Sequence, residues 1–173
     1  MVPTMKELFL MELEDEAPVT RRALEQVPEG KNDWKPHDKS MALGDLAYLV
    51  ANMPGWFALV IDQNELDIAP KPGRPRPQAP NTNAELLQQF DASVDKARDA
   101  LKKTTDAHLM TNWRMLFGGR VVSDRPRHHM LRTGVGNHLS HHRGQLTVYL
   151  RLLGKPVPAI YGPTADDKTF GVS

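Results

Sequence analysis

Four stretches of the chain repeat apolar residues at the spacing of an amphipathic helix, and this pattern constrains the fold more than any other feature. They run from about Lys6 to Val27, from Ser40 to Gln63, from Thr82 to Lys103 and from Thr133 to Leu153. Ser40 has the side chain of a helix N-cap, and Gly154 ends the fourth stretch. Pro18 and the Met53-Pro54-Gly55 run interrupt the first and second stretches, so we expect a kink at each. The sequence therefore predicts four helices.

The segment between the second and third stretches, residues 69–81, holds five prolines and three basic residues. Proline at this density is incompatible with a regular helix or a central strand. Pro72 and Pro75 have the PxxP spacing of an SH3 ligand, but we favour a stiff linker between two helices. With this linker inside it, the chain of 173 residues has the length of a single domain, residues 1–173.

A second connection, between the third and fourth stretches, has a different pattern. Residues 113–117 and 120–122 are rich in apolar and β-branched types, and Gly118-Gly119 lies between them. This arrangement predicts a short hairpin around a glycine turn. After the fourth stretch, residues 157–163 contain two prolines, and we expect an extended tail packed over one end of the helices.

The composition excludes several classes of protein. The chain has no cysteine, which excludes disulfides, zinc fingers and thiolate nucleophiles. Its formal charge of +1 gives no field for nucleic acid or an anionic membrane surface, so we expect neither partner. The N-terminal residues lack the pattern of a secretory signal, and no window is as apolar as a membrane span. We therefore expect a cytoplasmic protein.

Histidine is the one residue type with an unusual distribution. Five of the seven histidines fall between His128 and His142. His138 and His142 are four apart, so on a helix they share a face and can bind one cation. A helical wheel places both within roughly 40° of an apolar stripe that includes Val135 and Leu146. The alternative is a pair of core histidines satisfied by hydrogen bonds, but we favour a metal site or its remnant.

The residues around these histidines resemble the DinB/YfiT-like superfamily along nearly the whole chain. The likeness is carried by residues 20–24, 27–30, 34–41, 43–47, 53–56, 138–145, 149–151 and 161–163. The His-x-x-x-His-Arg-Gly-Gln run from His138 and the Trp-Lys-Pro-His run from Trp34 are specific only in combination. The resemblance implies an all-α fold: an antiparallel four-helix bundle, with a short hairpin or irregular segment before the last helix. It also implies a homodimer.

For the site, the resemblance implies a divalent metal, commonly nickel or zinc, held by three histidines. Two of them match His138 and His142, but the position of the third, on the second helix, is Leu49. Four residues could replace the missing ligand: His37, Asp45, Asn52 and Glu16. A site with two ligands would bind weakly, and a chain without bound metal stays open as an alternative.

The relatives implied by the resemblance include transferases that join low-molecular-weight thiols to electrophiles. We therefore expect a metal-dependent enzyme of the thiol-transferase or hydrolase type that acts on a small molecule. Because the chain has no cysteine, a thiol would have to arrive as a cosubstrate. No side chain is identified as a catalytic nucleophile. The alternative is a metal-free bundle that binds a small ligand or serves as a dimeric structural protein.

Overall fold

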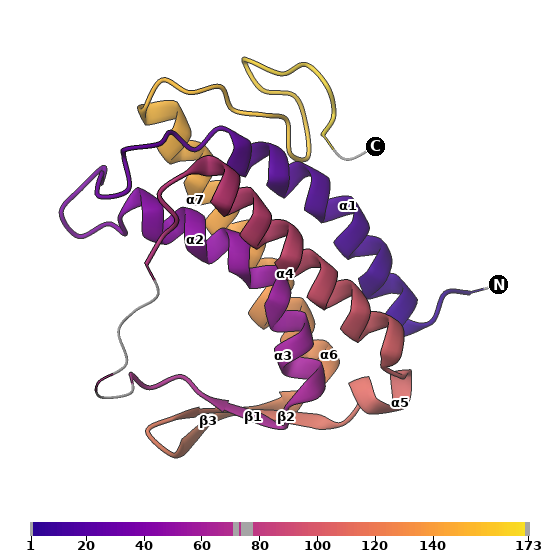
Figure 1. Cartoon of the computed structure of the whole chain (residues 1–173). Helices are drawn as coiled ribbons and strands as arrows, with labels where there is room; N and C mark the ends of the chain where they lie inside the picture. Colours follow the sequence, from indigo (N-terminus) through magenta and orange to yellow (C-terminus); the bar gives the residue numbers. More distant parts are fainter. Residues whose placement is uncertain (1, 71–72, 74–77, 172–173) are drawn as a thin grey trace.

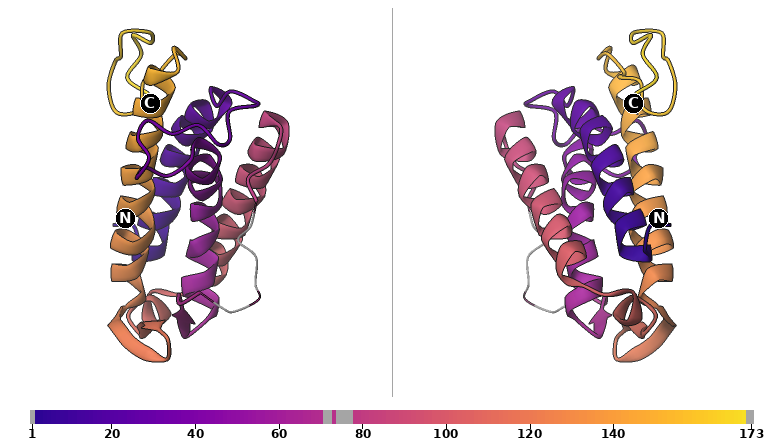
Figure 2. Two further views of the ribbon diagram at one scale, coloured as in Figure 1. Left: turned by 90° about the vertical axis from the view of Figure 1, so that its left-hand side faces the viewer. Right: turned by 90° about the vertical axis from the view of Figure 1, so that its right-hand side faces the viewer.

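A computed structural model describes residues 2–70, 73 and 78–171. Four long helices run side by side and form the body of the molecule (Figures 1 and 2). They are α1 (Met5–Glu25), α2 (Leu43–Asn52), α4 (Asn83–Lys103) and α7 (His138–Leu152). The shorter helices are η1 (Met53–Gly55), α3 (Trp56–Asp62), α5 (Asp106–Leu109), α6 (Arg127–Met130) and η2 (Leu131–Asn137).

The prediction of an all-α fold is wrong, because a three-stranded mixed sheet closes one end of the bundle (Figure 1). The predicted hairpin is present: β2 (Asn112–Phe117) pairs antiparallel with β3 (Arg120–Pro126). The sequence did not predict β1 (Glu65–Asp67), which pairs in parallel with β2. Three residues are too few to show an alternating pattern, so this strand has no periodic signal in the sequence.

The turn of the hairpin is held by the strand that the sequence did not predict. Gly118 and Gly119 both have positive φ values, 59° and 79°, as a type I′ turn requires. The side chain of Asp67 on β1 accepts hydrogen bonds from both glycine amides, at 3.0 and 2.8 Å. The sheet is therefore one unit in which β1 fixes the turn between β2 and β3.

Side-chain caps determine where two of the long helices begin. Thr4 and Thr82 each form a capping box, with Glu7 and Glu85 respectively, so α1 and α4 begin close to their predicted positions. The predicted cap at Ser40 is wrong, since α2 begins at Leu43 after Ala42. The predicted interruption at Met53-Pro54-Gly55 is the turn η1, after which α3 continues.

The stretch Leu43–Asp62, which contains α2, η1 and α3, is apolar enough to be tested as a membrane span. It has 20 residues, and an 18-residue window within it has a mean hydropathy of 1.3, so it meets that criterion by length and composition alone. However, 56% of the window is buried inside the bundle, as in the core helix of a soluble protein. Its core residues include Leu46, Val50 and Met53, each at most 1% exposed. Core packing therefore accounts for its hydropathy.

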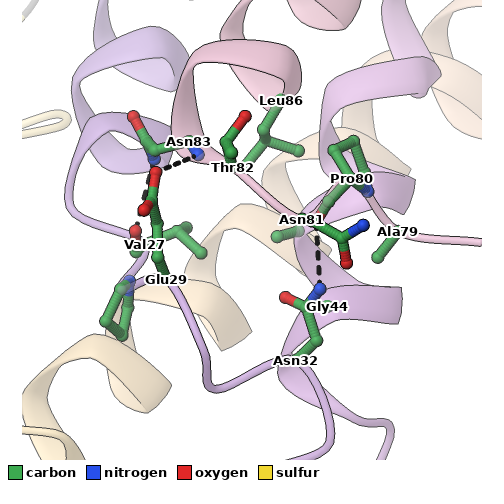
Figure 3. A pocket seen from close by; sticks show the side chains of 12 residues that line it. Val27, Glu29, Asn32, Gly44, Ala79, Pro80, Asn81, Thr82, Asn83 and Leu86 are labelled. Carbon is green, nitrogen blue, oxygen red and sulfur yellow. Dashed lines mark hydrogen bonds between the residues drawn. The ribbon is translucent and has the colours of Figure 1, made fainter.

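The polypeptide that enters α4 is fixed to the ends of α1 and α2 around a narrow crevice (Figure 3). The Asn83 side chain donates to the backbone carbonyls of Leu24 and Val27, and the Asn83 backbone N–H donates to the Glu29 carboxylate. The Asn32 side chain donates to the carbonyl of Pro80 at 2.9 Å. The crevice measures about 10 Å³, the room of roughly one water molecule, so its role is structural. Pro72 and Pro75, which have the PxxP spacing, lie outside the described residues.

Candidate metal centre

His138 and His142 point toward one another from consecutive turns of α7. Their Nε2 atoms are 2.9 Å apart and their ring centroids 4.6 Å apart. Two imidazole nitrogens bound to one cation at about 2.0–2.1 Å would lie roughly 2.9–3.4 Å apart, depending on the angle between them. The pair could therefore receive a cation with little movement of either ring.

The outward sides of the two rings have partners that orient them. In His142, Nδ1 lies 2.8 Å from Oε1 of Gln145. Since an amide oxygen can only accept, Nδ1 carries the hydrogen and Nε2 presents its lone pair toward His138. The His138 ring has a hydrogen bond to the backbone of Gly134 and lies 5.8 Å from the Trp56 ring. Outer partners of this kind are characteristic of metal-ligating histidines.

The electrostatics around His138 favour its neutral imidazole. The pKa of His138 is lowered, mainly because burial disfavours its charged form. The neighbouring His142 and His141 lower it further, and the hydrogen bond to Gly134 opposes them. A neutral imidazole is the form that ligates metals, so this environment favours metal binding over protonation near neutral pH.

The helical wheel predicted that both histidines lie on the buried face of α7. The structure instead places them at the edge of that face. Both histidines are half-buried, whereas Leu139, Arg143 and Leu146 are at most 6% exposed. The histidines flank this face on the side where Trp56, at the start of α3, lies against the His138 ring. A ligand or substrate could therefore reach them from solvent.

The third ligand position is not filled. Leu49 is half-buried on α2 and packs against the core, as its apolar side chain requires. Within residues 2–70, 73 and 78–171, no group of three or more His, Cys, Asp or Glu side chains is arranged to hold a metal. The donor set at His138 and His142 fits a cation bound through two protein nitrogens, and it does not fit a three-histidine site.

The four residues proposed as substitutes have other contacts. The Asn52 amide bonds to the Tyr48 carbonyl and to Gln89. The ring of His37 accepts from the amide of Lys39 in an exposed turn, and Asp45 is exposed. Glu16 belongs to a separate network on the other side of α7, described next. The structure therefore brings only His138 and His142 together.

The sequence reasoning assigned no role to Arg143, which is 1% exposed. Its Nη1 donates to Glu16 Oε2 at 2.6 Å and to Thr20 Oγ1 at 2.7 Å, and its Nη2 donates to the Tyr161 hydroxyl. The Tyr161 hydroxyl in turn lies 2.9 and 3.0 Å from the two Glu16 oxygens. This network ties α1, α7 and the C-terminal tail together. A helical wheel centred on Leu139 and Leu146 would have placed Arg143 in the core.

The fold and the site define a helical bundle closed at one end by a small sheet, with a histidine pair on its last long helix and leucine at the third ligand position. A family model described as "DinB family" matches residues 1–169, and the chain belongs to that family. The resemblance stated from the sequence is thereby confirmed.

Solved structures agree with this assignment at the level of the fold. A DinB-like protein from Bacillus cereus has a TM-score of 0.67 and 23% identity, covering 88% of this chain and 95% of its own. The DinB-like protein YjoA from Bacillus subtilis has a TM-score of 0.64 and 19% identity, covering 85% of this chain and 92% of its own. No protein with a curated description matches the sequence.

Proposed function

We propose that this chain is a metal-dependent enzyme of the thiol-transferase or hydrolase type that acts on a small molecule. In this proposal His138 and His142 bind one divalent cation, with nickel or zinc the expected metal. The observation that carries the proposal is the approach of their two Nε2 atoms to 2.9 Å, with the Nδ1 of His142 held by Gln145. Family membership adds support, since the histidine pair lies in the run that resembles the family's metal site.

The surrounding residues have definable roles in this proposal. Gln145 fixes the tautomer of His142, and Trp56 limits the rotation of His138 by packing against its ring. A divalent cation held there would act as a Lewis acid toward a substrate oxygen or thiol. The chain contains no cysteine, so a reacting thiol would be a low-molecular-weight cosubstrate. We further propose a cytoplasmic homodimer that has no nucleic-acid or membrane partner.

Leu49 favours a second candidate function. With leucine at the third position, the chain would be a metal-free bundle that binds a small ligand or serves as a dimeric structural protein. The two candidate functions differ in whether the histidine pair supports catalysis, so variants at His138 and His142 separate them.

The test is a comparison of turnover in matched histidine variants. Protein loaded with zinc or nickel is assayed with cysteine and 1-chloro-2,4-dinitrobenzene for thiol transfer, and with 4-nitrophenyl acetate for hydrolysis. We expect activity in the wild type and its loss in the His138→Ala, His142→Ala variant and after chelation. His141→Ala is the control, because this neighbouring histidine is exposed. Equal rates in all proteins, or no activity in any, would contradict the enzyme and favour the metal-free bundle.

A further inference from the structure

The side chain of Ser93, in the middle of α4, reaches into the break between α2 and α3. Its hydroxyl oxygen accepts a hydrogen bond from the Gly55 N–H at 2.7 Å, and the same hydroxyl donates to the Asn52 carbonyl at 3.0 Å. Ser93 is 3% exposed, so these contacts are shielded from solvent. One hydroxyl therefore satisfies two backbone groups, one before and one after Pro54.

The break between α2 and α3 needs a partner from outside because Pro54 has no backbone N–H. A side chain that inserts into the ladder of i→i−4 hydrogen bonds is one cause of a sharp helix kink. Here the inserted side chain comes from a neighbouring helix, and a Cβ on Gly55 would lie 3.0 Å from Ser93 Oγ. Gln89, one turn before Ser93, adds a second contact by donating to the Asn52 side chain at 2.7 Å. Two polar side chains of α4 thus hold the turn η1.

Trp56 is the residue that follows this turn and begins α3. Its ring centroid lies 5.8 Å from that of His138, and the two ring planes are inclined by 53°. Because Gly55 and Trp56 are adjacent in the chain, a change in the backbone at Gly55 changes the direction of the Trp56 side chain. The position of the Trp56 ring against His138 therefore depends on a hydroxyl group of another helix.

The orientation of the His138 ring decides whether the histidine pair can bind a cation. Its Nε2 atom lies 2.9 Å from Nε2 of His142, and rotation of the ring would turn that lone pair away. The backbone of Gly134 and the ring of Trp56 adjoin the His138 ring and hold it in place. Loss of an outer partner of a metal ligand typically costs about 10–100-fold in metal affinity. A displaced Trp56 should therefore weaken cation binding at the pair.

We propose that Ser93 is a positioning residue for the candidate metal centre. Its hydroxyl holds the turn η1, the turn places Trp56, and Trp56 keeps the His138 ring directed toward His142. This inference rests on the proposed function, because it assigns Ser93 a part in cation binding at the histidine pair. Ser93 itself touches neither the cation nor a substrate, and it acts through Trp56.

The first experiment measures the position of the His138 ring in metal-free protein by proton nuclear magnetic resonance at pH 8. An imidazole with an ordinary pKa of roughly 6.5 is neutral at this pH, so the chemical shift reports the neighbouring indole rather than protonation. His138→Ala identifies the resonance, and Trp56→Ala gives its position without the indole. Ser93→Ala should move the resonance toward the Trp56→Ala position. Ser93→Thr, which keeps the hydroxyl, should leave it at the wild-type position.

The second experiment measures zinc affinity by competition with a chromophoric chelator. Ser93→Ala should weaken zinc binding by about tenfold, the lower end for loss of an outer partner, and Ser93→Thr should bind as the wild type does. The matched control is Val94→Ala, which removes buried atoms from the same helix where it lines a groove with Ala17 and Pro18 of α1. This control should lower stability and change neither the resonance nor the zinc affinity.

Two results would overturn the proposal. One is a His138 resonance that stays at its wild-type position in Ser93→Ala or moves equally in Val94→Ala. The other is an unchanged zinc affinity in Ser93→Ala when the wild type binds zinc. If zinc binds to none of the proteins, the proposed function fails, and the resonance alone decides whether Ser93 positions His138. Circular dichroism melts show that each variant is folded at the temperature of the measurement.

Discussion

Arg143 on α7 and Glu16 on α1 form an ion pair across the bundle, with 2.6 Å between Nη1 and Oε2. The guanidinium side chain is 1% exposed and the carboxylate side chain 29%. Replacing Arg143 alone leaves the Glu16 carboxylate without its cation. Replacing both residues with neutral ones removes the positive and the negative charge at once. The pair therefore links two helices and the tail through a contact that no apolar pattern describes.

Arg143→Met should lower the free energy of unfolding by about 3 kcal/mol, the lower end for a broken buried pair, since water reaches Glu16. Adding Glu16→Gln should cost less than the sum of the two single variants, because the residues share one network. Urea unfolding followed by circular dichroism gives the four values of this cycle. Strict additivity would show that the pair is not coupled.

Replacing Arg127 should destabilise the fold even when the new residue is lysine. The Arg127 guanidinium is 2% exposed and donates to Val60 O, Gln63 O, Asn64 Oδ1, Thr111 Oγ1 and Asn112 O. Lysine has three donors where arginine has five, so at least two acceptors lose their partner, at about 1–3 kcal/mol each. We expect Arg127→Lys to destabilise the chain by about 2 kcal/mol or more in urea unfolding. The exposed Arg125→Lys is the control, and an equal effect there would contradict this account.

Acid should release the C-terminal tail. Hydrogen bonds from the Ala159 and Thr169 amides, with Arg22 nearby, lower the pKa of Asp167 to about 2. Because the folded pKa lies below the value of 3.8 for the free carboxyl, the unfolded state binds the proton first as pH falls. The stabilisation is therefore present above about pH 4 and is lost as pH falls toward 2.

Hydrogen exchange of the Ala159 amide, which donates to Asp167 at 2.9 Å, measures this release. Its protection should decrease between pH 4 and pH 2 in the wild type, after correction for the intrinsic exchange rate. In Asp167→Asn it should be low throughout. A profile that is identical in the two proteins would show that Asp167 does not hold the tail.

Leu49→His should strengthen metal binding at the histidine pair. Leu49 is half-buried on α2, which packs against α7. A third protein nitrogen should raise zinc or nickel affinity by more than the roughly tenfold effect of an outer partner. Competition with a chromophoric chelator measures this affinity, and Leu49→Phe is the control, because it introduces a ring without a ligating nitrogen. An unchanged affinity would mean that position 49 cannot reach the cation.

The sequence predicted the features that repeat over many residues or have distinctive chemistry. The long helices followed from apolar periodicity, the start of α4 from Thr82, and the hairpin from Gly118-Gly119. The strand β1 was missed because three residues carry no periodicity. The turn η2 was missed because its residues fit a regular helical pattern as well.

The candidate site also contains residues that the sequence predicted and residues that it did not. His138 and His142 follow from spacing alone, because four residues on a helix bring two side chains together. The role of Arg143 depends on Glu16 and Tyr161, which are 127 and 18 residues away in the chain. Only the packed bundle brings those groups together, and sequence spacing cannot reveal them.

The central claim, that His138 and His142 bind a divalent cation, is tested most directly by the metal content of the purified protein. Elemental mass spectrometry is applied to the wild type, to His138→Ala, His142→Ala and to His141→Ala, each supplied with zinc or nickel and then desalted. We predict close to one equivalent of metal in the wild type and in His141→Ala, and none in the double variant. No metal in any of the three, or equal metal in all, would contradict the claim.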